Sequence, residues 1–354
     1  MKNSLSSKPE VVELANYHQV STRGNCVENL RKFALSKVEQ FLATYPIEAD
    51  SINVITKVVC DKLSVKVEFI EADEDIHRIS EEYGEFNKTL SHTLEAEFVR
   101  GSTEGITLRS TDQFPGFRKF LAIIDARGGR RARAYFTTWH EIAHLLLPTK
   151  DQEKEKIRRT PNQRAKKKDP IESVIDHVAG YLAIYEPIFK PVLLAKVGEL
   201  GFSFEAFEQA RDICLPEASL LATLIRSINF FSFPVLLLQA DLKLKKGEEQ
   251  IANSPQLGFG FFEDSIEPKL RVSQLIWNEN AKSGNFNIQV NMRIPESSVL
   301  STAYYNEVDA TYQNGENQNW WETSKSGALS ALPIHVQAVR RGRYVYGLIT
   351  LQVV

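Results

Sequence analysis

Cysteine is scarce in this chain. The 354 residues include 3 cysteines, Cys26, Cys60 and Cys214, which are far apart in the sequence and odd in number. A disulfide scaffold needs more cysteines at closer spacing, so this composition excludes a small secreted protein held together by disulfides. We therefore expect reduced thiols and a cytoplasmic location.

Long apolar runs are also missing. The longest, residues 230–238, contains Pro234, and it is far shorter than the roughly 20 residues that a helix needs to cross a bilayer. The first residues lack the apolar core of a signal peptide. Neither sign of charge dominates, because the net charge is −2. We expect no membrane contact, and no overall field that draws the protein to nucleic acid.

The chain does have enough length and apolar content for two domains. Hydrophobic residues make up 43% of the sequence, which is enough to bury a sizeable core. Near residues 246–256 a charged segment gives way to Asn253, Ser254 and Pro255, a change typical of a domain boundary. We expect a flexible arm at residues 1–24, a first domain at residues 25–246 and a second at residues 256–354.

The most informative motif lies near the middle of the chain, where His140, Glu141 and His144 form an H-E-x-x-H pattern. On an α-helix a spacing of four residues is about one turn, so both imidazoles project from one face and can share a metal. Apolar residues at helical spacing accompany them, and Pro148 ends the run. The other interpretation is a buried helix that carries two histidines and no metal.

The start of this helix decides whether Glu141 is free to react. Thr138 and Glu141 fit a capping box, in which the glutamate would bond to the backbone. Thr137 fits a simple N-cap, which would leave Glu141 able to reach a metal-bound water. We favour Thr137 as the N-cap.

A zinc site needs a third protein ligand, and the next helix offers one. Asp169 and Pro170 predict a helix start. At about 100° per residue, Glu172 and Asp176 lie roughly 40° apart on that helix, whereas His177 points about 140° away from Glu172. We expect Glu172 to be the ligand, and Asp176 to accept a hydrogen bond from a ligand histidine. The alternative for both acids is a solvated first turn that the helix dipole favours.

Residues 136–147 and the pattern Glu-x-x-x-Asp-x-Val-Ala that begins at Glu172 resemble the ImmA/IrrE metallopeptidases. The resemblance covers about residues 28–230 and is sharpest at about residues 133–187. It implies that His140, His144 and Glu172 hold one zinc ion and that Glu141 is the catalytic base. Where the family often has a small residue and a phenylalanine around the later acid, this chain has Ile175 and Val178, which keep the apolar character.

The same resemblance implies a zincin-like α+β core and a cellular role. Members of the family typically cleave a helix-turn-helix repressor, and the cleavage switches on stress, mobile-element or anti-phage genes. Two-domain members paired with a repressor in anti-phage operons match this length and layout best. A second hypothesis is a non-proteolytic regulator, in which structural zinc supports binding to a partner protein or DNA. Glu141 argues against it, because a structural site has no use for a base.

Periodicity predicts the elements around the motif. We expect helices at residues 25–42 and 51–63, with Ser51 as the N-cap of the second. Alternation predicts strands at residues 65–69, 94–98, 106–108 and 120–124, and Gly128 with Gly129 predicts a turn that returns the chain to the metal helix. Helices at 203–214 and 216–229 follow. Arg226 is the only basic residue of the last one, so we expect this pair to pack rather than to read DNA.

The pattern of the C-terminal part predicts a β-sheet. Residues 286–294 alternate strictly between apolar and polar, residues 334–338 do the same, and Gly342 turns the chain into a strand at 344–354. We expect residues 314–319 to be a polar loop before Trp320 and Trp321. This part resembles the GAF-like sensor domain of some family members. The alternative is a structural or dimerising sheet domain, with the tryptophan pair in its core rather than in a ligand cage.

A basic segment separates the two predicted metal-binding helices. Residues 150–169 carry nine positive and four negative charges. The simplest interpretation is a solvated loop. The alternative is a flap beside the active site that attracts an anion such as single-stranded DNA, which would then activate the enzyme. The candidate contact residues are Arg158, Arg159, Arg164, Lys166, Lys167 and Lys168.

Overall fold

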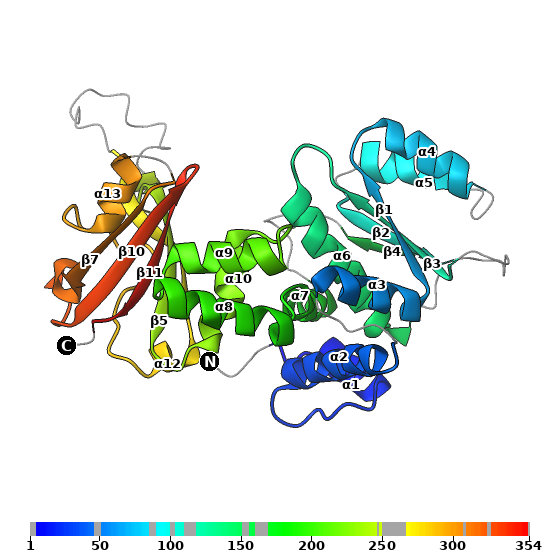
Figure 1. Ribbon diagram of the computed structural model, residues 1–354, viewed down its shortest axis with the longest axis horizontal. Coiled ribbons are helices and arrows are strands. Elements are labelled where there is room, and N and C mark those ends of the chain that lie inside the picture. Colours follow the sequence, from blue (N-terminus) through cyan, green and yellow to red (C-terminus); the bar gives the residue numbers. More distant parts are fainter. Residues whose placement is uncertain are drawn as a thin grey trace. The chain divides into compact units, whose positions relative to one another are not determined.

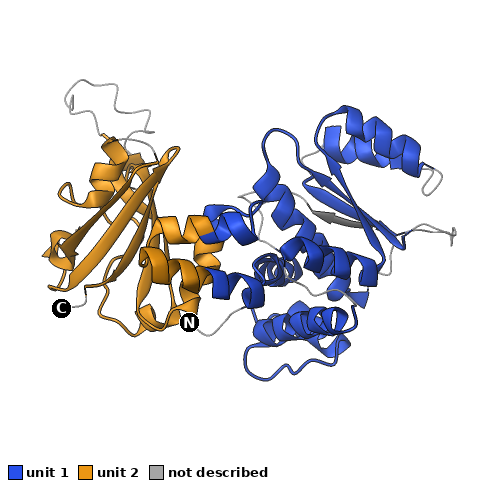
Figure 2. Cartoon of the chain, in the orientation of Figure 1, with its two compact units in different colours: residues 1–192, 210–222 blue, residues 193–209, 223–354 orange. Residues whose placement is uncertain are grey.

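The computed structural model describes residues 5–45, 51–84, 90–99, 103–109, 118–150, 156–159, 169–245, 248–249, 267–306, 309–323 and 327–352. The chain divides into two compact units (Figure 2). Unit 1 comprises Met1–Val192 and Ala210–Ala222, and unit 2 comprises Leu193–Gln209 and Thr223–Val354. Each unit contains helices and a sheet, so the predicted mixed α+β class is confirmed.

Unit 1 is built on a four-stranded sheet with helices on both faces (Figure 1). β1 runs parallel to β3, and the other two pairs of neighbours are antiparallel. The strands predicted at 65–69, 106–108 and 120–124 are present. In their order across the sheet the strands are β1 (Val65–Ile70), β3 (Phe120–Asp125), β2 (Gly105–Arg109) and β4 (Lys156–Arg159).

Alternation along β2 separates the two faces of this sheet. Ile106 and Leu108 lie in an apolar core with α4 (Glu74–Tyr83) and α5 (Leu90–Leu94). Thr107, between them, points to the opposite face and hydrogen-bonds to α6 (Arg131–Leu146), the helix that carries the H-E-x-x-H motif. The period of two therefore places β2 between a packed core and the metal-site helix.

Three polar residues cap helices that the sequence predicts to begin beside them, namely Asn25, Ser51 and Asp169. The side chain of each accepts a hydrogen bond from a backbone N–H in the first turn. These helices and those that follow are α2 (Cys26–Ala43), α3 (Ile52–Leu63), α7 (Pro170–Ala183), α8 (Glu186–Leu200), α9 (Phe204–Cys214), α10 (Leu220–Ser227) and the 3-10 turn η3 (Ile228–Phe230).

The N-terminal segment is not the flexible arm that we expect for residues 1–24. Residues Pro9–Tyr17 form α1, which contacts α2 and α7. Val11, Leu14 and Ala15 are buried on one face of it. The helix is only nine residues long, too short for a convincing periodic pattern. Its stability comes from this packed apolar face rather than from helix propensity.

Leu14→Ala should destabilise the protein by about 2–5 kcal/mol, because Leu14 is 3% exposed and its removal leaves a cavity between packed helices. Urea unfolding would measure the change in the free energy of unfolding. Asn16→Ala on the exposed side of the same helix is the control and should have almost no effect. Equal stability of the two variants would mean that α1 is detached in solution.

Two other local predictions for unit 1 are wrong, namely a strand at residues 94–98 and Thr137 as an N-cap. Residues 94–98 end α5 and form the π-helix η1 (Glu95–Val99) rather than a strand. Gly128 and Gly129 turn the chain with positive φ angles, as predicted, and α6 begins directly afterwards at Arg131. Alanine and arginine alternate there, and both are strong helix formers. Thr137 consequently lies buried well inside α6 and is not its N-cap.

Unit 2 is organised around a five-stranded antiparallel sheet (Figure 1). Helix α13 (Val299–Tyr305) packs on it, and Trp321 lies in the apolar core while Trp320 is 40% exposed. Across the sheet the strands are β6 (Lys269–Trp277), β5 (Val235–Lys243), β11 (Tyr344–Leu351), β10 (Pro333–Arg341) and β7 (Thr311–Asn317). Shorter elements are α12 (Glu279–Lys282), η5 (Gln318–Trp320), β8 (Glu322–Thr323) and β9 (Gly327–Ala328).

The boundary predicted at residues 246–256 does not separate the units, because β5 and β6 on either side of it are antiparallel neighbours in one sheet. The predicted loop at 314–319 is largely β7. Four of the five apolar residues at 286–294 are buried as expected, but Val290 is 49% exposed. The segment forms no strand, and a single bridge joins Arg293 to Arg271. Asn291, with a φ of 71°, breaks the extended backbone there.

Within the described ranges, no single helix has the length and apolar content to cross a bilayer. Only α7 and α8 pass that test as a pair, and they are bent by 55° at their junction.

Candidate metal centre

The helix α6 brings two histidines to one face, as the spacing of four residues predicts. His140 and His144 are each 1% exposed, and their Nε2 atoms lie 3.2 Å apart. Apolar neighbours on the same helix, Ile142, Ala143 and Leu146, are buried as well. Both imidazoles are therefore fixed inside the protein with the same ring nitrogen turned to a common point.

Glu172 reaches that point from the first turn of α7. Its Oε2 atom is 3.2 Å from the Nε2 of His140, and its Oε1 atom is 3.3 Å from the Nε2 of His144. Asp169 and Pro170 begin the helix, and this start sets the rotation at which Glu172 faces α6. The predicted geometry, in which Glu172 rather than His177 joins the histidines, is what the structure contains.

The donor atoms have the spacing that a metal ion requires. Zinc lies about 2.0–2.1 Å from histidine nitrogens and from carboxylate oxygens, so two ligands of a tetrahedral site are about 3.3 Å apart. The three distances among His140, His144 and Glu172 are 3.2, 3.2 and 3.3 Å. This group could bind a metal ion. Two histidines and one glutamate are also a donor set of catalytic zinc sites, which leave a fourth position for water.

The environment keeps Glu172 in its anionic form. Burial alone would raise its pKa, but hydrogen bonds to His140 and His144 and the charge of these two residues lower it far below its usual range. Glu172 therefore offers a carboxylate to a cation over the whole neutral range of pH. Its side chain is 33% exposed, and it borders a pocket of about 300 Å³ that α1 and α7 help to line. The centre is thus reachable from outside.

Asp176 lies one turn after Glu172 and supports His140. Its Oδ1 atom is 2.8 Å from the Nδ1 of His140. When Nδ1–H donates to this carboxylate, the lone pair of Nε2 is free for a metal, and the ring cannot rotate. The contact matches the prediction that Asp176 accepts a hydrogen bond from a ligand histidine.

Asp176→Ala should weaken metal binding by roughly ten- to a hundredfold, because His140 loses the partner that fixes its tautomer and orientation. Competition with a chromogenic chelator would measure the change in zinc affinity. His177→Ala, at the next position of the same helix, is the control, since its ring lies outside the metal group. An unchanged zinc affinity in Asp176→Ala would mean that the carboxylate of Asp176 has no role in orienting His140.

Glu141 is held by a residue that the sequence does not reveal. Glu141 is 1% exposed, and its Oε2 atom accepts a hydrogen bond of 2.7 Å from the Oγ1 of Thr107 on β2. Its Oε1 atom accepts no hydrogen bond from the groups that the structure describes. Thr138 donates instead to the backbone oxygen of Ala134, so the capping box is not formed and Glu141 stays off the backbone.

Gly105 makes this approach of β2 to α6 possible. A Cβ atom at Gly105 would lie 2.6 Å from the Cγ2 of Thr137 and 3.3 Å from the Oε1 of Glu141. Any larger residue would push β2 away from the helix and weaken the bond between Thr107 and Glu141. A glycine and a threonine two positions apart in a strand are common, so no sequence signal singles them out.

The remaining candidates lie elsewhere. His177 is 39% exposed on its side chain, with its Nε2 atom 4.0 Å from Glu28, and it is not part of the metal group. Arg158 and Arg159 lie in β4, whose backbone pairs with β2. Arg164, Lys166, Lys167 and Lys168 lie outside the described residues.

Comparisons with known proteins find no similarity in sequence and a structural similarity of low score. No family model matches the sequence, and no curated protein is similar to it. Among solved structures, a Mycobacterium tuberculosis transcriptional regulator aligns with a TM-score of 0.41 and 7% sequence identity, over 92% of this chain and 81% of that chain.

Proposed function

We propose that the protein is a zinc-dependent endopeptidase of the ImmA/IrrE type, with a zincin-like core in unit 1. The observation that carries the proposal is the convergence of His140, His144 and Glu172 at 3.2–3.3 Å beside the buried carboxylate of Glu141. A purely structural metal site needs four protein ligands and no base. Here three donors and a neighbouring carboxylate support a hydrolytic centre instead.

Each side chain of the centre has a separate role in peptide hydrolysis. Zinc at the three donors would supply Lewis acidity, which lowers the pKa of a water and polarises a carbonyl. Glu141 takes the proton of the attacking water on Oε1 and later gives it to the leaving amine. Thr107 holds Oε2 through its hydroxyl, so that Oε1 is the oxygen left for the proton. Asp176 keeps His140 in place throughout.

The substrate that we propose is a helix-turn-helix repressor, whose cleavage releases stress or anti-phage genes. The support for this class is the likeness of residues 136–147 and of the pattern after Glu172 to the ImmA/IrrE motifs. Unit 2, a sheet of five strands with α13 against it, is then a GAF-like sensor domain attached to the peptidase, and the protein works in the cytoplasm.

The test is a cleavage reaction with the product of a neighbouring repressor-like gene. Purified, zinc-loaded protein should cut it at a discrete position, a chelator should stop the reaction, and added zinc should restore it. Mass spectrometry of the fragments would identify the bond. Stable binding of the repressor without any cut, at full zinc content, would favour the non-proteolytic regulator instead.

We propose single-stranded DNA as the activator. A repressor that is always present in the cell must stay uncut when there is no signal, so the peptidase needs an activator. If it binds the basic segment, Arg164, Lys166, Lys167 and Lys168 changed together to serine should abolish stimulation and leave zinc content unchanged. Stimulation should also fall steeply with salt, since neutralised phosphates release counterions. Equal cleavage rates with and without oligonucleotide across a salt series would mean that these residues take no part in activation.

A further inference from the structure

A second cavity lies in unit 1, on the side of α6 that faces away from the metal centre. Its volume is about 730 Å³, within the range of roughly 300–1,000 Å³ that small-molecule sites occupy. The α6 residues that line it, including Tyr135 and Trp139, have a mean direction about 170° away from the mean direction of His140 and His144 at 100° per residue. The rest of the wall comes mainly from α3 and β1. We call this space the aromatic cavity.

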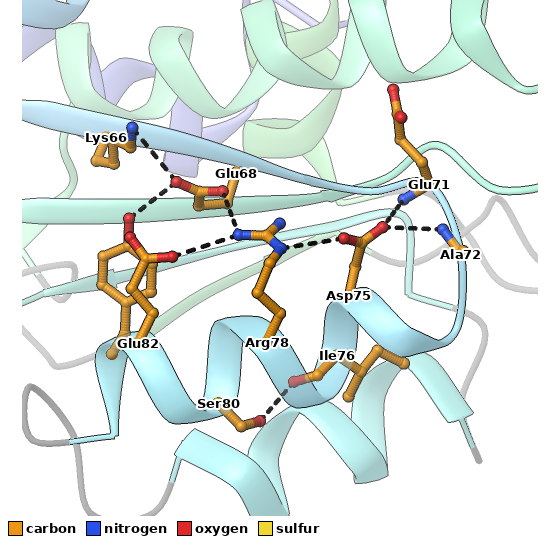
Figure 3. A network of polar contacts seen from close by, with 10 residues as sticks. Lys66, Glu68, Glu71, Ala72, Asp75, Ile76, Arg78, Ser80 and Glu82 are labelled. Carbon is orange, nitrogen blue, oxygen red and sulfur yellow. Dashed lines mark hydrogen bonds and ion pairs between the residues drawn. The ribbon is translucent and has the colours of Figure 1, made fainter.

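Alternation along β1 gives the cavity an apolar floor. Val65, Val67 and Phe69 line it, whereas the side chains of Lys66 and Glu68 join a polar network with Arg78 on α4 (Figure 3). Phe69 is 40% exposed, which is costly for a phenylalanine unless something covers it. Tyr135 on the facing helix is partly buried, and together with Phe69 it offers aromatic surface to a flat ligand, whereas Trp139 is 1% exposed and contributes little surface.

The charges around the cavity balance. Arg118 and Asp61 form an ion pair of 2.6 Å. Among the described residues, Lys57 and Arg131 form no ion pair, and the same is true of Glu71 and Glu217, which also line the wall. Figure 3 shows the side chain of Glu71 directed away from the Arg78 network. Lys66 also lines the cavity, but its side chain is paired with Glu68. The two remaining cations and two remaining carboxylates leave no net charge to select an anion or a cation.

We propose that the aromatic cavity binds a flat, aromatic small molecule without net charge, and that its occupant acts on the metal-site helix. Trp139 directly precedes His140 in α6. Tyr135 hydrogen-bonds through its hydroxyl to the backbone oxygen of Ala183 at the end of α7, the helix that carries Glu172 and Asp176. A ligand against the ring of Tyr135 therefore touches a residue that joins the two metal-binding helices. The effect on cleavage rests on the proposed function, whereas binding does not.

The chain contains its own reporter of occupancy. Cys60 lines the cavity and is partly accessible, while Cys26 and Cys214 are buried. Burial and the charge of Asp61 raise the pKa of Cys60 to about 11, so its thiolate is scarce and alkylation is best followed near about pH 9. N-ethylmaleimide should modify Cys60 first, and peptide mapping by mass spectrometry would verify the position.

The probe is N-phenyl-1-naphthylamine, a neutral aromatic amine whose fluorescence rises in apolar surroundings. It should bind the full-length protein saturably at one site per chain and slow the alkylation of Cys60 roughly tenfold at saturation. Its sulfonated relative, 8-anilinonaphthalene-1-sulfonate, should bind more weakly, because the charge of its sulfonate has no net counter-charge at the wall.

Two exposed apolar residues make a matched pair of variants. Phe69→Ala should weaken probe binding roughly tenfold, since it removes one aromatic surface. Ile213→Ala, which is 62% exposed in wild type and lies outside the cavity, should leave it unchanged. Because Phe69 is already half-exposed, its loss should not unfold the protein. Equal affinities of the two variants, or unhindered alkylation of Cys60 at saturating probe, overturn the site.

The coupling to the metal helix has its own measurement. Saturating probe should change the zinc dissociation rate, followed with a chromogenic chelator, and this change should be absent in Phe69→Ala. The readout does not depend on peptidase activity, so it separates this proposal from the proposed function. If the probe protects Cys60 from alkylation but does not change the zinc dissociation rate, the coupling is wrong.

Discussion

His140→Ala, His144→Ala and Glu172→Ala should each lose most of the bound zinc, whereas the wild-type protein should bind about one ion per chain. Each variant removes one of three donor atoms that lie 3.2–3.3 Å apart. Two protein donors rarely retain zinc against a chelator, and cleavage should be lost with it. Inductively coupled plasma mass spectrometry of dialysed protein would give the zinc content.

His177→Ala is the matched control for these variants. It removes a histidine from the same helix as Glu172, but its ring lies beside Tyr181 and outside the metal group. Its zinc content should equal that of the wild type. Full zinc content in Glu172→Ala would mean that another residue is the third ligand, and it would contradict the geometry proposed for this centre.

Zinc should also stabilise the folded chain, since a metal that binds only the native state adds stability in proportion to the logarithm of its concentration over Kd. At a hundredfold excess over Kd the gain is about 2.7 kcal/mol. Thermal unfolding with zinc and with chelator should show the difference in wild type and His177→Ala. The three ligand variants should unfold at the same temperature under both conditions.

The arrangement of the donor atoms follows from helix geometry and was predictable. A spacing of four residues defines the pair His140 and His144, and a helix start at Asp169 fixes the direction in which Glu172 and Asp176 point. These are local rules, and the meeting of α6 with α7 is the one long-range event they need. The separation of 28 residues between the motif and Glu172 carries no geometric information of its own.

The supports of the site were not predictable, because they depend on contacts across the sheet. Thr107 binds Glu141 from 34 positions away, and no pattern in β2 marks it. The same limit explains β5 and β6, which went unrecognised. Residues Val235–Leu238 are buried throughout, so their apolar run lacks the period of two by which a half-exposed strand is recognised. Alternation at residues 286–294 predicts burial at four of its five apolar positions, but Val290 is 49% exposed beside Asn291, whose φ of 71° breaks the extended backbone.

Glu141→Gln should stop cleavage and leave zinc bound. Glutamine has nearly the shape of glutamate and can still bond to the hydroxyl of Thr107, but its amide takes no proton from water. Cleavage of the repressor should therefore fall by roughly 10²- to 10⁴-fold, the contribution expected of a general base. Single-turnover cleavage at saturating substrate, with zinc content measured on the same preparation, would give the rate of the chemical step.

Thr107→Val is the variant that separates positioning from proton transfer. It keeps the carboxylate of Glu141 but removes the 2.7 Å hydrogen bond that orients it. Cleavage should fall less than in Glu141→Gln, because the base is still present but is no longer held in one orientation. Undiminished proteolysis in Glu141→Gln would exclude Glu141 as the base, and a loss of zinc in that variant would mean that its carboxylate holds the metal site together.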